Sequence, residues 1–264
     1  MKPTEMHPPA QIQQWAKRQL TDYDSQRPGS LFAEGLCLSV EEGYQLQTAV
    51  AQLRVQRGDA IIGYKVGCTS TKIRTQLGIS HCVTGRLYEP ERYQSGVELC
   101  RSGYASLAIE GELAVSLSRE PTDEDLTHDG IPACIAKVFP VIELHNQVMH
   151  GDPPSAAQLI ANNAIHAGFV ASEGSSNHPL DRSPTLSIHI DGNCVETCQG
   201  PTLIQTIRSS LQWLRGSLKE QGETLGNGQI ILTGSILSLI PVHEDCHIQV
   251  LAPPFGMVEA RFRL

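Results

Sequence analysis

Two glutamates, Glu110 and Glu112, stand out because they lie within an apolar run, Leu107–Val115. We expect this run to be a strand, and since strand side chains alternate between faces, both carboxylates would share one face. Adjacent like charges repel and are costly to bury. A divalent cation would offset that cost, because hard cations take oxygen ligands from carboxylates. The alternative interpretation is that both glutamates line the solvent side of an edge strand.

A third carboxylate, Glu143, lies in a second apolar run, Val138–His145, which is also expected to be a strand. Three carboxylates that left coordination positions open for water and substrate would make a catalytic Mg²⁺ or Mn²⁺ site. His145 would lie on the same face as Glu143 and could contact that site. The alternative for this histidine is a structural role.

A lone lysine, Lys65, is the charged residue of a third strand-like run, Ala60–Val66. Strand alternation allows it to face the surface. It also allows Lys65 to point into a polar site beside the carboxylates. The sequence alone does not decide between these two interpretations.

The composition excludes several classes of function. A chain of 264 residues suits one large domain or two small ones. The net charge of −8, without a cluster of Lys and Arg, argues against nucleic acid and anionic membrane surfaces as partners. No run approaches the ~18 apolar residues of a membrane span, and residues 1–10 lack the apolar stretch of a signal peptide. The eight cysteines are scattered, which is typical of reduced thiols in a cytoplasmic protein.

The elements that would position these side chains follow from periodicity and capping signals. Residues 9–20 and 39–58 are predicted helices, the second beginning with a Ser39–Glu42 capping box. Further helices are predicted from Ser70, from Ser155 and over 201–219, and strands over 60–66, 104–118, 136–145, 186–190, 229–233, 247–251 and 258–264. Strands that do not alternate strictly with helices indicate an α+β class with a mixed, rolled sheet. We divide the chain into an N-terminal helical cap region, 1–58, and a catalytic region, 59–264.

An ordered set of short motifs resembles the 2-keto-4-pentenoate hydratase and 4-oxalocrotonate decarboxylase branch of the fumarylacetoacetate hydrolase superfamily. The motifs are, in order, Gly63–Ser70, Gln76–Gly78, Gly85–Leu87, Glu110–Glu112, Pro140–Glu143, Asn163–Ala164 with Gly168, and Leu232–Ser235 with Pro241. The resemblance covers residues 38–264. The resemblance implies an α+β fold, a mixed β-roll or sandwich of the fumarylacetoacetase C-terminal-domain type, with N-terminal helices.

The resemblance also implies roles for single residues. Glu110, Glu112 and Glu143 would bind Mg²⁺ or Mn²⁺, and Lys65 would be the catalytic residue. The residues that would line the substrate pocket are Thr69, Ser70, Thr233, Gly234 and Ser235. A homo-oligomer is implied as well.

Three places depart from the family pattern. The family's hydratases usually carry Asp where Asn162 stands, and an acid near the position of Val83 and Thr84. An Arg often follows the third metal ligand by a few residues, in the region where this chain has Val148. The predicted ligands are present, whereas part of the shell around the substrate differs.

These observations predict a divalent-metal-dependent hydratase that adds water to a 2-hydroxy-2,4-dienoate, or its 2-oxo tautomer, in catabolism of the aromatic meta-cleavage type. The alternatives are a decarboxylase of a 2-oxo-3-enedioate, an acylpyruvate C–C hydrolase, and a non-catalytic subunit that works beside a decarboxylase. The expected partners are a small 2-oxo or 2-hydroxy-dienoate acid and other copies of the chain. No nucleic acid and no membrane are expected as partners.

Overall fold

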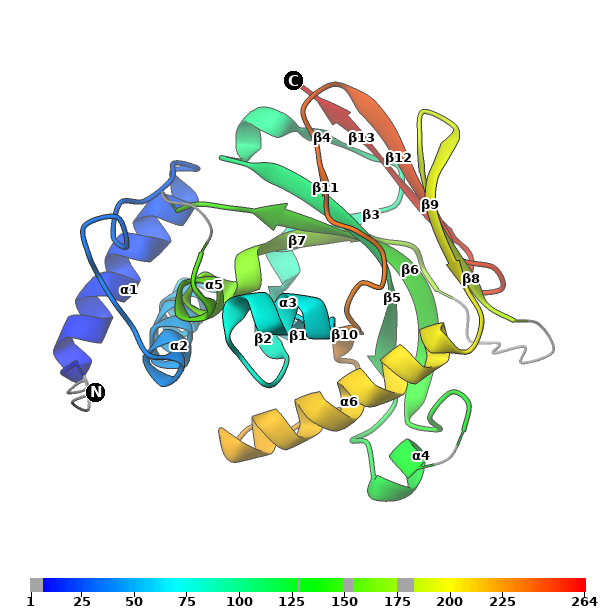
Figure 1. Cartoon of the computed structure of the whole chain (residues 1–264), viewed down its shortest axis with the longest axis horizontal. Coiled ribbons are helices and arrows are strands. Elements are labelled where there is room, and N and C mark those ends of the chain that lie inside the picture. The colour runs from blue at the N-terminus through cyan, green and yellow to red at the C-terminus, as the bar shows by residue number, and fades with distance from the viewer. Residues whose placement is uncertain (1–6, 128, 150–153, 175–182) are drawn as a thin grey trace.

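The computed structural model describes residues 7–127, 129–149, 154–174 and 183–264. These residues form two β-sheets packed against each other, with helices along one side and below (Figure 1). The helices are α1 (Pro9–Asp24), α2 (Val40–Gln56), α3 (Thr71–Leu77), α4 (Asp123–Thr127), α5 (Ala156–Ala161) and α6 (Thr202–Glu220), with short 3₁₀ turns η1 (Glu89–Glu91), η2 (Arg101–Gly103) and η3 (Asn163–Ile165). The strands are β1 (Ile61–Gly67), β2 (Val83–Tyr88), β3 (Arg92–Gln94), β4 (Val97–Cys100), β5 (Leu107–Leu117), β6 (Ile135–Asn146), β7 (His166–Ala171), β8 (Thr185–Ile190), β9 (Asn193–Gln199), β10 (Ile230–Leu232), β11 (Ile240–Pro241), β12 (Cys246–Leu251) and β13 (Met257–Arg263).

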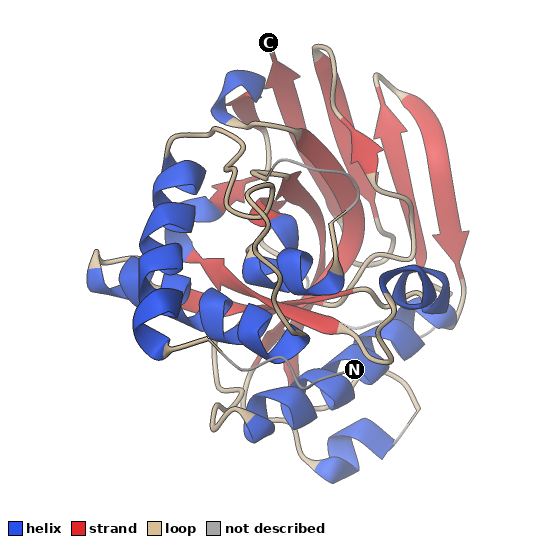
Figure 2. Cartoon of the chain, turned by 60° about the vertical axis from the view of Figure 1, so that its left-hand side comes forward, coloured by secondary structure: helices blue, strands red, loops and turns tan. Residues whose placement is uncertain are grey.

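Both sheets are mixed. The larger sheet has the strand order β2-β1-β10-β5-β6-β7-β3, with β11 beside β5, and the smaller has the order β4-β13-β12-β8-β9. The pairs β1–β10, β3–β7 and β4–β13 are parallel, and the other pairs are antiparallel. Figure 2 shows the strands curving around one another while the helices gather to the side. The predicted α+β class with a mixed, rolled sheet is confirmed.

Side-chain alternation along β5 and β6 divides the larger sheet into two faces. Ile109 and Ile142 point to one face and pack in a core with Ile188 of the smaller sheet. Glu110 and Glu143, one residue along from these, therefore point to the opposite face. The same alternation in β1 buries Tyr64 and Val66 in the shared core and turns Lys65 toward the carboxylates. The core thus fixes which face of the sheet carries the polar side chains.

The N-terminal helices lie beside the open face of the larger sheet. Helices α1 and α2 pack together in an apolar cluster that includes Ile12, Leu46 and Ala161. Gln47 of α2 joins this cluster to the sheet, because its amide donates to the carbonyl oxygens of Thr84 at 2.9 Å and of Ile160 at 2.8 Å. The proposed boundary at residue 58 stays a prediction, and the contacts across it are buried.

Several local predictions are confirmed. Ser39 and Glu42 form the predicted capping box at the start of α2. The pair Asp191–Gly192 is a hairpin-turn signal in the sequence, and with φ of 50° and 81° these residues make the turn between β8 and β9. The predicted helix from Ser70 is α3, although the Ser70 side chain, a possible helix cap by residue type, makes no capping hydrogen bond.

Other elements were not predicted. Strands β2, β4 and β9 are formed by segments without a clear alternating pattern, and α4 lies within the polar segment 119–129, whose composition indicates a loop. The Ser/Asn/Pro-rich composition of 171–184 predicts a surface loop, but this run lies largely outside the described residues. No described helix has both the length and the apolar content that crossing a membrane requires.

Candidate metal and substrate site

The three predicted carboxylates meet on one face of the larger sheet. Strands β5 and β6 are antiparallel, and their register sets Glu110 directly opposite Glu143. Glu112, two residues along β5, projects from the same face as Glu110. The predicted convergence of three acidic side chains from distant parts of the sequence is therefore present.

His145 joins this group from the end of β6. Its Nε2 atom lies 3.2 Å from Glu110 Oε2 and 3.5 Å from Glu143 Oε2. The predicted contact between His145 and the carboxylate site is confirmed. Its other ring nitrogen, Nδ1, is buried and has no hydrogen-bond partner in the part of the chain that the structure describes.

Lys65 reaches the same group from β1, which β10 separates from β5. Its side chain is only 3% exposed, and its Nζ lies 3.1 Å from Glu143 Oε1. Burial disfavours the ammonium, but the carboxylates of Glu143, Glu110 and Glu112 outweigh that effect and raise the pKa of Lys65. Of the two interpretations of Lys65, the buried, site-facing one describes the structure.

Three basic side chains contact Glu143. Besides Lys65 and His145, His166 of β7 places its Nδ1 2.7 Å from Glu143 Oε1. Burial opposes ionisation of Glu143, but Lys65, His145 and His166 together hold its pKa well below the usual range. Sequence reasoning missed His166. The one available signal was a histidine at the head of the apolar run that forms β7.

The environment of Glu112 differs from that of Glu143, because it raises the pKa instead of lowering it. Glu112 is 1% exposed, and neither of its carboxylate oxygens has a hydrogen-bond partner among the residues described. Burial and the nearby negative charge of Glu143 raise the pKa of Glu112 well above the usual range. A buried carboxyl with two unpaired oxygens, next to two further carboxylates, is an arrangement that a divalent cation would stabilise. The side chains present therefore fit a divalent metal.

Among the described residues, the atoms best placed to hold one ion together come from Glu110, Glu143 and His145. Their ligand atoms all lie within 4.8 Å of one another. This group includes His145 and not Glu112, whose role as a metal ligand stays a prediction. Carboxylate oxygens suit Mg²⁺ and Mn²⁺, and an imidazole nitrogen is a further ligand that transition ions accept.

A cavity of about 450 Å³ opens beside this group. Lys65, Glu110 and His145 line it together with Thr69, Ser70 and Ser235, three of the residues predicted to contact substrate.

The other two predicted substrate contacts lie behind the cavity wall. Thr233 is 1% exposed, and its hydroxyl donates to the Leu113 carbonyl at 2.7 Å. Gly234 has a φ of +90°, and a Cβ there would lie 2.4 Å from Thr69 Cγ2. Both residues therefore shape the turn that presents Ser235, and neither is among the residues that line the cavity. The expected contact of Thr233 and Gly234 with substrate stays a prediction.

The wall opposite Ser235 contains unusual backbone. Asn163, Ala164 and Ile165 have successive φ values of 54°, 52° and 55°. Such conformations cost on the order of 1–3 kcal/mol each for residues with a side chain, and they concentrate at functional sites. The Asn163 side chain holds the turn, because it accepts from the Arg86 N–H at 2.7 Å and donates to the Arg86 carbonyl at 2.8 Å. Ala164 and Ile165 line the cavity as a result.

The three departures from the family pattern occupy different places. Val83 is fully buried in the structure and lines the cavity. Asn162 ends α5, and its amide donates to the Gln158 carbonyl at 3.0 Å. Val148 is buried away from the cavity, and its carbonyl accepts the Gly29 N–H at 3.0 Å. Only Val83 is in a position to contact a bound ligand directly.

The chain is similar in sequence to two kinds of known enzyme. No protein-family model matches the chain. The chain is 24% identical over 217 residues to 2-keto-4-pentenoate hydratase of Paraburkholderia xenovorans (strain LB400), covering 80% of this chain and 81% of the relative. It is 25% identical over 228 residues to 4-oxalocrotonate decarboxylase of Pseudomonas putida, covering 85% and 86%.

Its fold matches that of the 4-oxalocrotonate decarboxylase from Pseudomonas putida G7, solved in complex with magnesium and adipate. The TM-score is 0.87 at 23% identity, over 98% of this chain and 100% of that one. The resemblance to the 2-keto-4-pentenoate hydratase and 4-oxalocrotonate decarboxylase branch of the fumarylacetoacetate hydrolase superfamily is thus confirmed along most of the sequence and across the whole fold.

Proposed function

We propose that this chain is a divalent-metal-dependent hydratase that adds water to a 2-hydroxy-2,4-dienoate or its 2-oxo tautomer. The observation that carries the proposal is the convergence of Glu110, Glu112 and Glu143 with Lys65 beside a cavity that Lys65 and Glu110 line. The likeness to relatives named as a hydratase and a decarboxylase supports the substrate class.

The cation would be Mg²⁺ or Mn²⁺, held by Glu110 and Glu143 together with Glu112, His145 or both. When bound, it would supply positive charge beside the 2-oxo oxygen, where negative charge develops during proton transfer. Magnesium is the first candidate, because hard oxygen ligands dominate the site.

The residues of the chain would handle the protons. Hydration adds a hydroxyl to one carbon of a double bond and a proton to the other, so one group must accept a proton and another must return it. When Glu112 rather than His145 completes the metal site, His145 at the cavity wall is the candidate to take the proton from water. The Lys65 ammonium would hold the 2-oxo oxygen and return a proton, while Thr69, Ser70 and Ser235 offer polar contacts nearby.

A decarboxylase of a 2-oxo-3-enedioate is the second candidate, because it would use the same charge stabilisation and the sequence likeness to a decarboxylase is equally high. The purified protein with Mg²⁺ or Mn²⁺ should be given a 2-hydroxy-2,4-dienoate, a 2-oxo-3-enedioate and an acylpyruvate. Mass analysis separates the reactions, since hydration adds water, decarboxylation loses CO₂ and hydrolysis cleaves a C–C bond. We expect the dienoate to gain one water. Absence of turnover on all three acids would leave the non-catalytic subunit as the better interpretation.

Glu112→Gln tests the metal site. We expect metal affinity and turnover to fall together, turnover by at least about 100-fold, because an amide is a poorer ligand than a carboxylate. Burial raises the pKa of Glu112, so glutamine resembles its neutral form and the metal-free variant should remain folded. Calorimetric titration with Mn²⁺ and rate measurements provide the test, and normal activity in this variant would rule out the site.

The variant Lys65→Met tests whether Lys65 takes part in the reaction itself, as distinct from metal binding. Methionine keeps most of the side-chain volume but removes the ammonium, so this variant should bind metal and lose turnover. Full turnover at full metal occupancy would exclude a chemical role for Lys65. The predicted homo-oligomer, the decarboxylase partner and the cytoplasmic location stay predictions.

A further inference from the structure

The cavity beside the carboxylates has two chemically different ends. Lys65, Glu110 and His145 make one end charged and polar. Lys65 and His145 are buried, whereas three apolar residues of the lining, Ile73, Ile236 and Leu239, are exposed, so these three lie at the mouth of the cavity, which we call its second end. The polar side chains of Thr69, Ser70, Ser235 and Ser238 also line the cavity.

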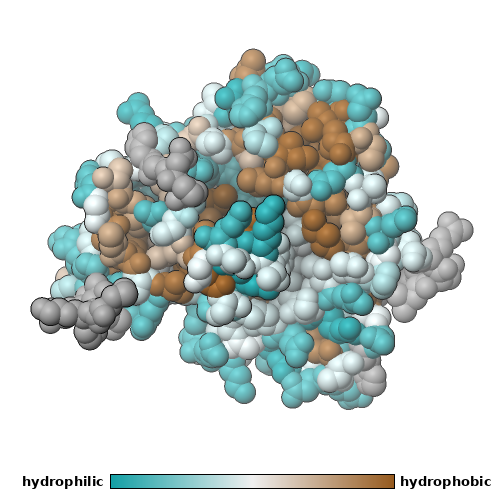
Figure 3. All heavy atoms as spheres, viewed as in Figure 1, coloured by the Kyte–Doolittle hydropathy of each residue, from teal (hydrophilic) through white to brown (hydrophobic). Residues whose placement is uncertain are grey.

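Exposed apolar side chains are concentrated at this second end. Among the described residues, the large hydrophobic side chains left exposed include Ile73 at 41%, Ile236 at 37% and Leu239 at 44%, and all three line this cavity. Figure 3 shows hydrophobic atoms on both sides of α3, at the centre of the face. Single exposed apolar residues are ordinary, but a contiguous group at a cavity marks a surface that a ligand covers.

The second end also lacks a cation. Lys65 is the only lysine or arginine among the described residues that line the cavity, and its ammonium is already 3.1 Å from Glu143. Arg74 of α3 is close by, but it donates to the carbonyl oxygens of Cys68 at 3.1 Å and of Thr69 at 2.6 Å. Its guanidinium is therefore occupied by two backbone carbonyls, and Arg74 is not among the residues that line the cavity.

The rim of this end carries a negative charge instead. The Glu196 carboxylate accepts the Ser238 N–H at 2.8 Å and the Ser238 hydroxyl at 3.1 Å, and Ser238 lines the cavity. A ligand carboxylate placed there would meet hydrocarbon and a like charge. Burying a charge without a partner is costly, whereas burying hydrocarbon is favourable.

We infer that this site selects 2-oxo and 2-hydroxy-dienoate acids whose far end is a hydrocarbon tail, and that it discriminates against acids with a second carboxylate there. The inference rests on the proposed function, because it takes the acid end of the ligand to lie at Lys65 and the carboxylates. The cavity volume of about 450 Å³ leaves room for a tail beyond the reacting carbons.

Two unreactive probes of equal carbon number test the inference. 2-Oxohexanoate ends in a methyl group and 2-oxohexanedioate ends in a carboxylate, while their acid ends are the same. Calorimetric titration of the Mn²⁺-loaded protein should show that 2-oxohexanoate binds at least about tenfold more tightly than 2-oxohexanedioate. A tenfold difference in affinity corresponds to about 1.4 kcal/mol, which is less than the cost of burying an unpaired charge.

A variant adds the missing charge. Leu239→Arg places a guanidinium at the apolar end and should raise affinity for 2-oxohexanedioate by at least about fivefold relative to 2-oxohexanoate. Val55→Arg is the matched control, because Val55 is similarly exposed on α2 but does not line the cavity. It should leave the ratio of the two affinities unchanged.

The outcomes separate this inference from the proposed function. Equal or tighter binding of 2-oxohexanedioate to the unaltered protein overturns the inference, and turnover of a dienoate would then still support the hydratase. Failure of both probes to bind a protein that holds its metal overturns the inference and the proposed function together. If Leu239→Arg changes only the oligomeric state, measured by light scattering, while the affinity ratio stays fixed, the apolar end is an interface between copies and the inference is wrong.

Discussion

At the scale of single residues, the site shifts the pKa values of two buried glutamates in opposite directions. Glu112 and Glu143 are each 1% exposed. Burial and the neighbouring negative charge raise the pKa of Glu112, whereas Lys65 and two histidines overcome burial and lower the pKa of Glu143. Pairs of titratable groups whose pKa values diverge in this way are typical of functional sites. Neighbouring charges, rather than burial, decide the difference.

Glu42 gives a prediction about pH outside the site. Burial opposes its charge, but the backbone N–H groups of Ser39 and His7 and the His7 ring outweigh burial and lower its pKa to about 2. A lowered folded-state pKa stabilises the protein above the unfolded pKa of about 4.3, and that stabilisation is lost as the pH falls toward the folded value. We expect Glu42→Gln to reduce the free energy of unfolding by about 1–3 kcal/mol at pH 7.

The loss of unfolding free energy caused by Glu42→Gln should become smaller as the pH falls from about 4.3 toward about 2, because the carboxylate of the unaltered protein then becomes protonated. Urea titrations at pH 7, 5, 4 and 3 measure it. Glu41→Gln, at the exposed neighbouring position, should change stability by less than about 0.5 kcal/mol at every pH. A difference for Glu42→Gln that stayed constant with pH would contradict the assigned cause.

At the scale of elements, β5 has to carry the carboxylates on one face and pack closely on the other. Gly111 lies between Glu110 and Glu112 and faces the smaller sheet. A Cβ at this position would lie 2.7 Å from Ile188 Cγ1 and 3.0 Å from Val250 Cγ2. The absent side chain lets β8 and β12 approach β5 directly behind the site. The position of the carboxylates therefore depends on the packing of the two sheets.

Gly111→Ala should destabilise the protein by about 1–3 kcal/mol, because the added methyl group overpacks the core between the sheets. The displacement of β5 should also weaken Mn²⁺ binding. Urea unfolding and calorimetric titration measure the two effects. Gly216→Ala is the control, since Gly216 is exposed in α6 and nothing lies within 4 Å of an added Cβ. Alanine there should stabilise the protein by about 0.5–1 kcal/mol; an equal loss in both variants would contradict the packing argument.

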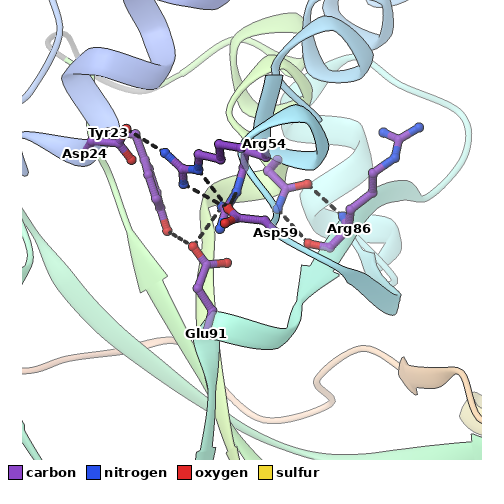
Figure 4. A network of polar contacts seen from close by, with 8 residues as sticks. Tyr23, Asp24, Arg54, Asp59, Arg86 and Glu91 are labelled. Carbon is purple, nitrogen blue, oxygen red and sulfur yellow. Dashed lines mark hydrogen bonds and ion pairs between the residues drawn. The ribbon is translucent and has the colours of Figure 1, made fainter. Parts of the chain in front are cut away.

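At the scale of the whole molecule, a buried polar network joins the N-terminal helices to the sheet (Figure 4). Arg54 of α2 contacts Asp59 at 2.7 Å and Glu91 at 2.8 Å, and Tyr23 of α1 donates to Glu91 at 2.8 Å. The Arg54 guanidinium also lies 3.6 Å from the centre of the Tyr88 ring. Breaking a buried ion pair by removing one partner costs far more than breaking an exposed one.

We therefore expect the helical region 1–58 and the rest of the chain to unfold together. In a Trp213→Phe variant, Trp15 of α1 is the remaining tryptophan, so its fluorescence reports the N-terminal helices while far-UV circular dichroism reports the whole chain. The two signals should share one urea midpoint. Adding Arg54→Ala should lower stability by about 3–5 kcal/mol in both signals, and Arg57→Ala, at a more exposed pair, by about 0–1 kcal/mol. Two separate transitions would support an independent N-terminal domain.

The sequence by itself determined the local features. The two-residue spacing of Glu110 and Glu112 set their common face, and the order Ser39 to Glu42 set a helix start. The apolar stripe over residues 201–219 predicted the helix that the structure contains as α6. These predictions succeeded because each depends on a repeat or a hydrogen bond within a few residues of the chain.

Only the tertiary structure decided which of these residues meet. The β5–β6 register brought Glu110 opposite Glu143, the strand order brought Lys65 to the same point, and β7 supplied His166. The tertiary structure also directs the Thr233 hydroxyl toward the Leu113 carbonyl and away from the cavity. Periodicity fixes the face on which a side chain lies, but register and strand order depend on pairing between segments that are far apart in the chain.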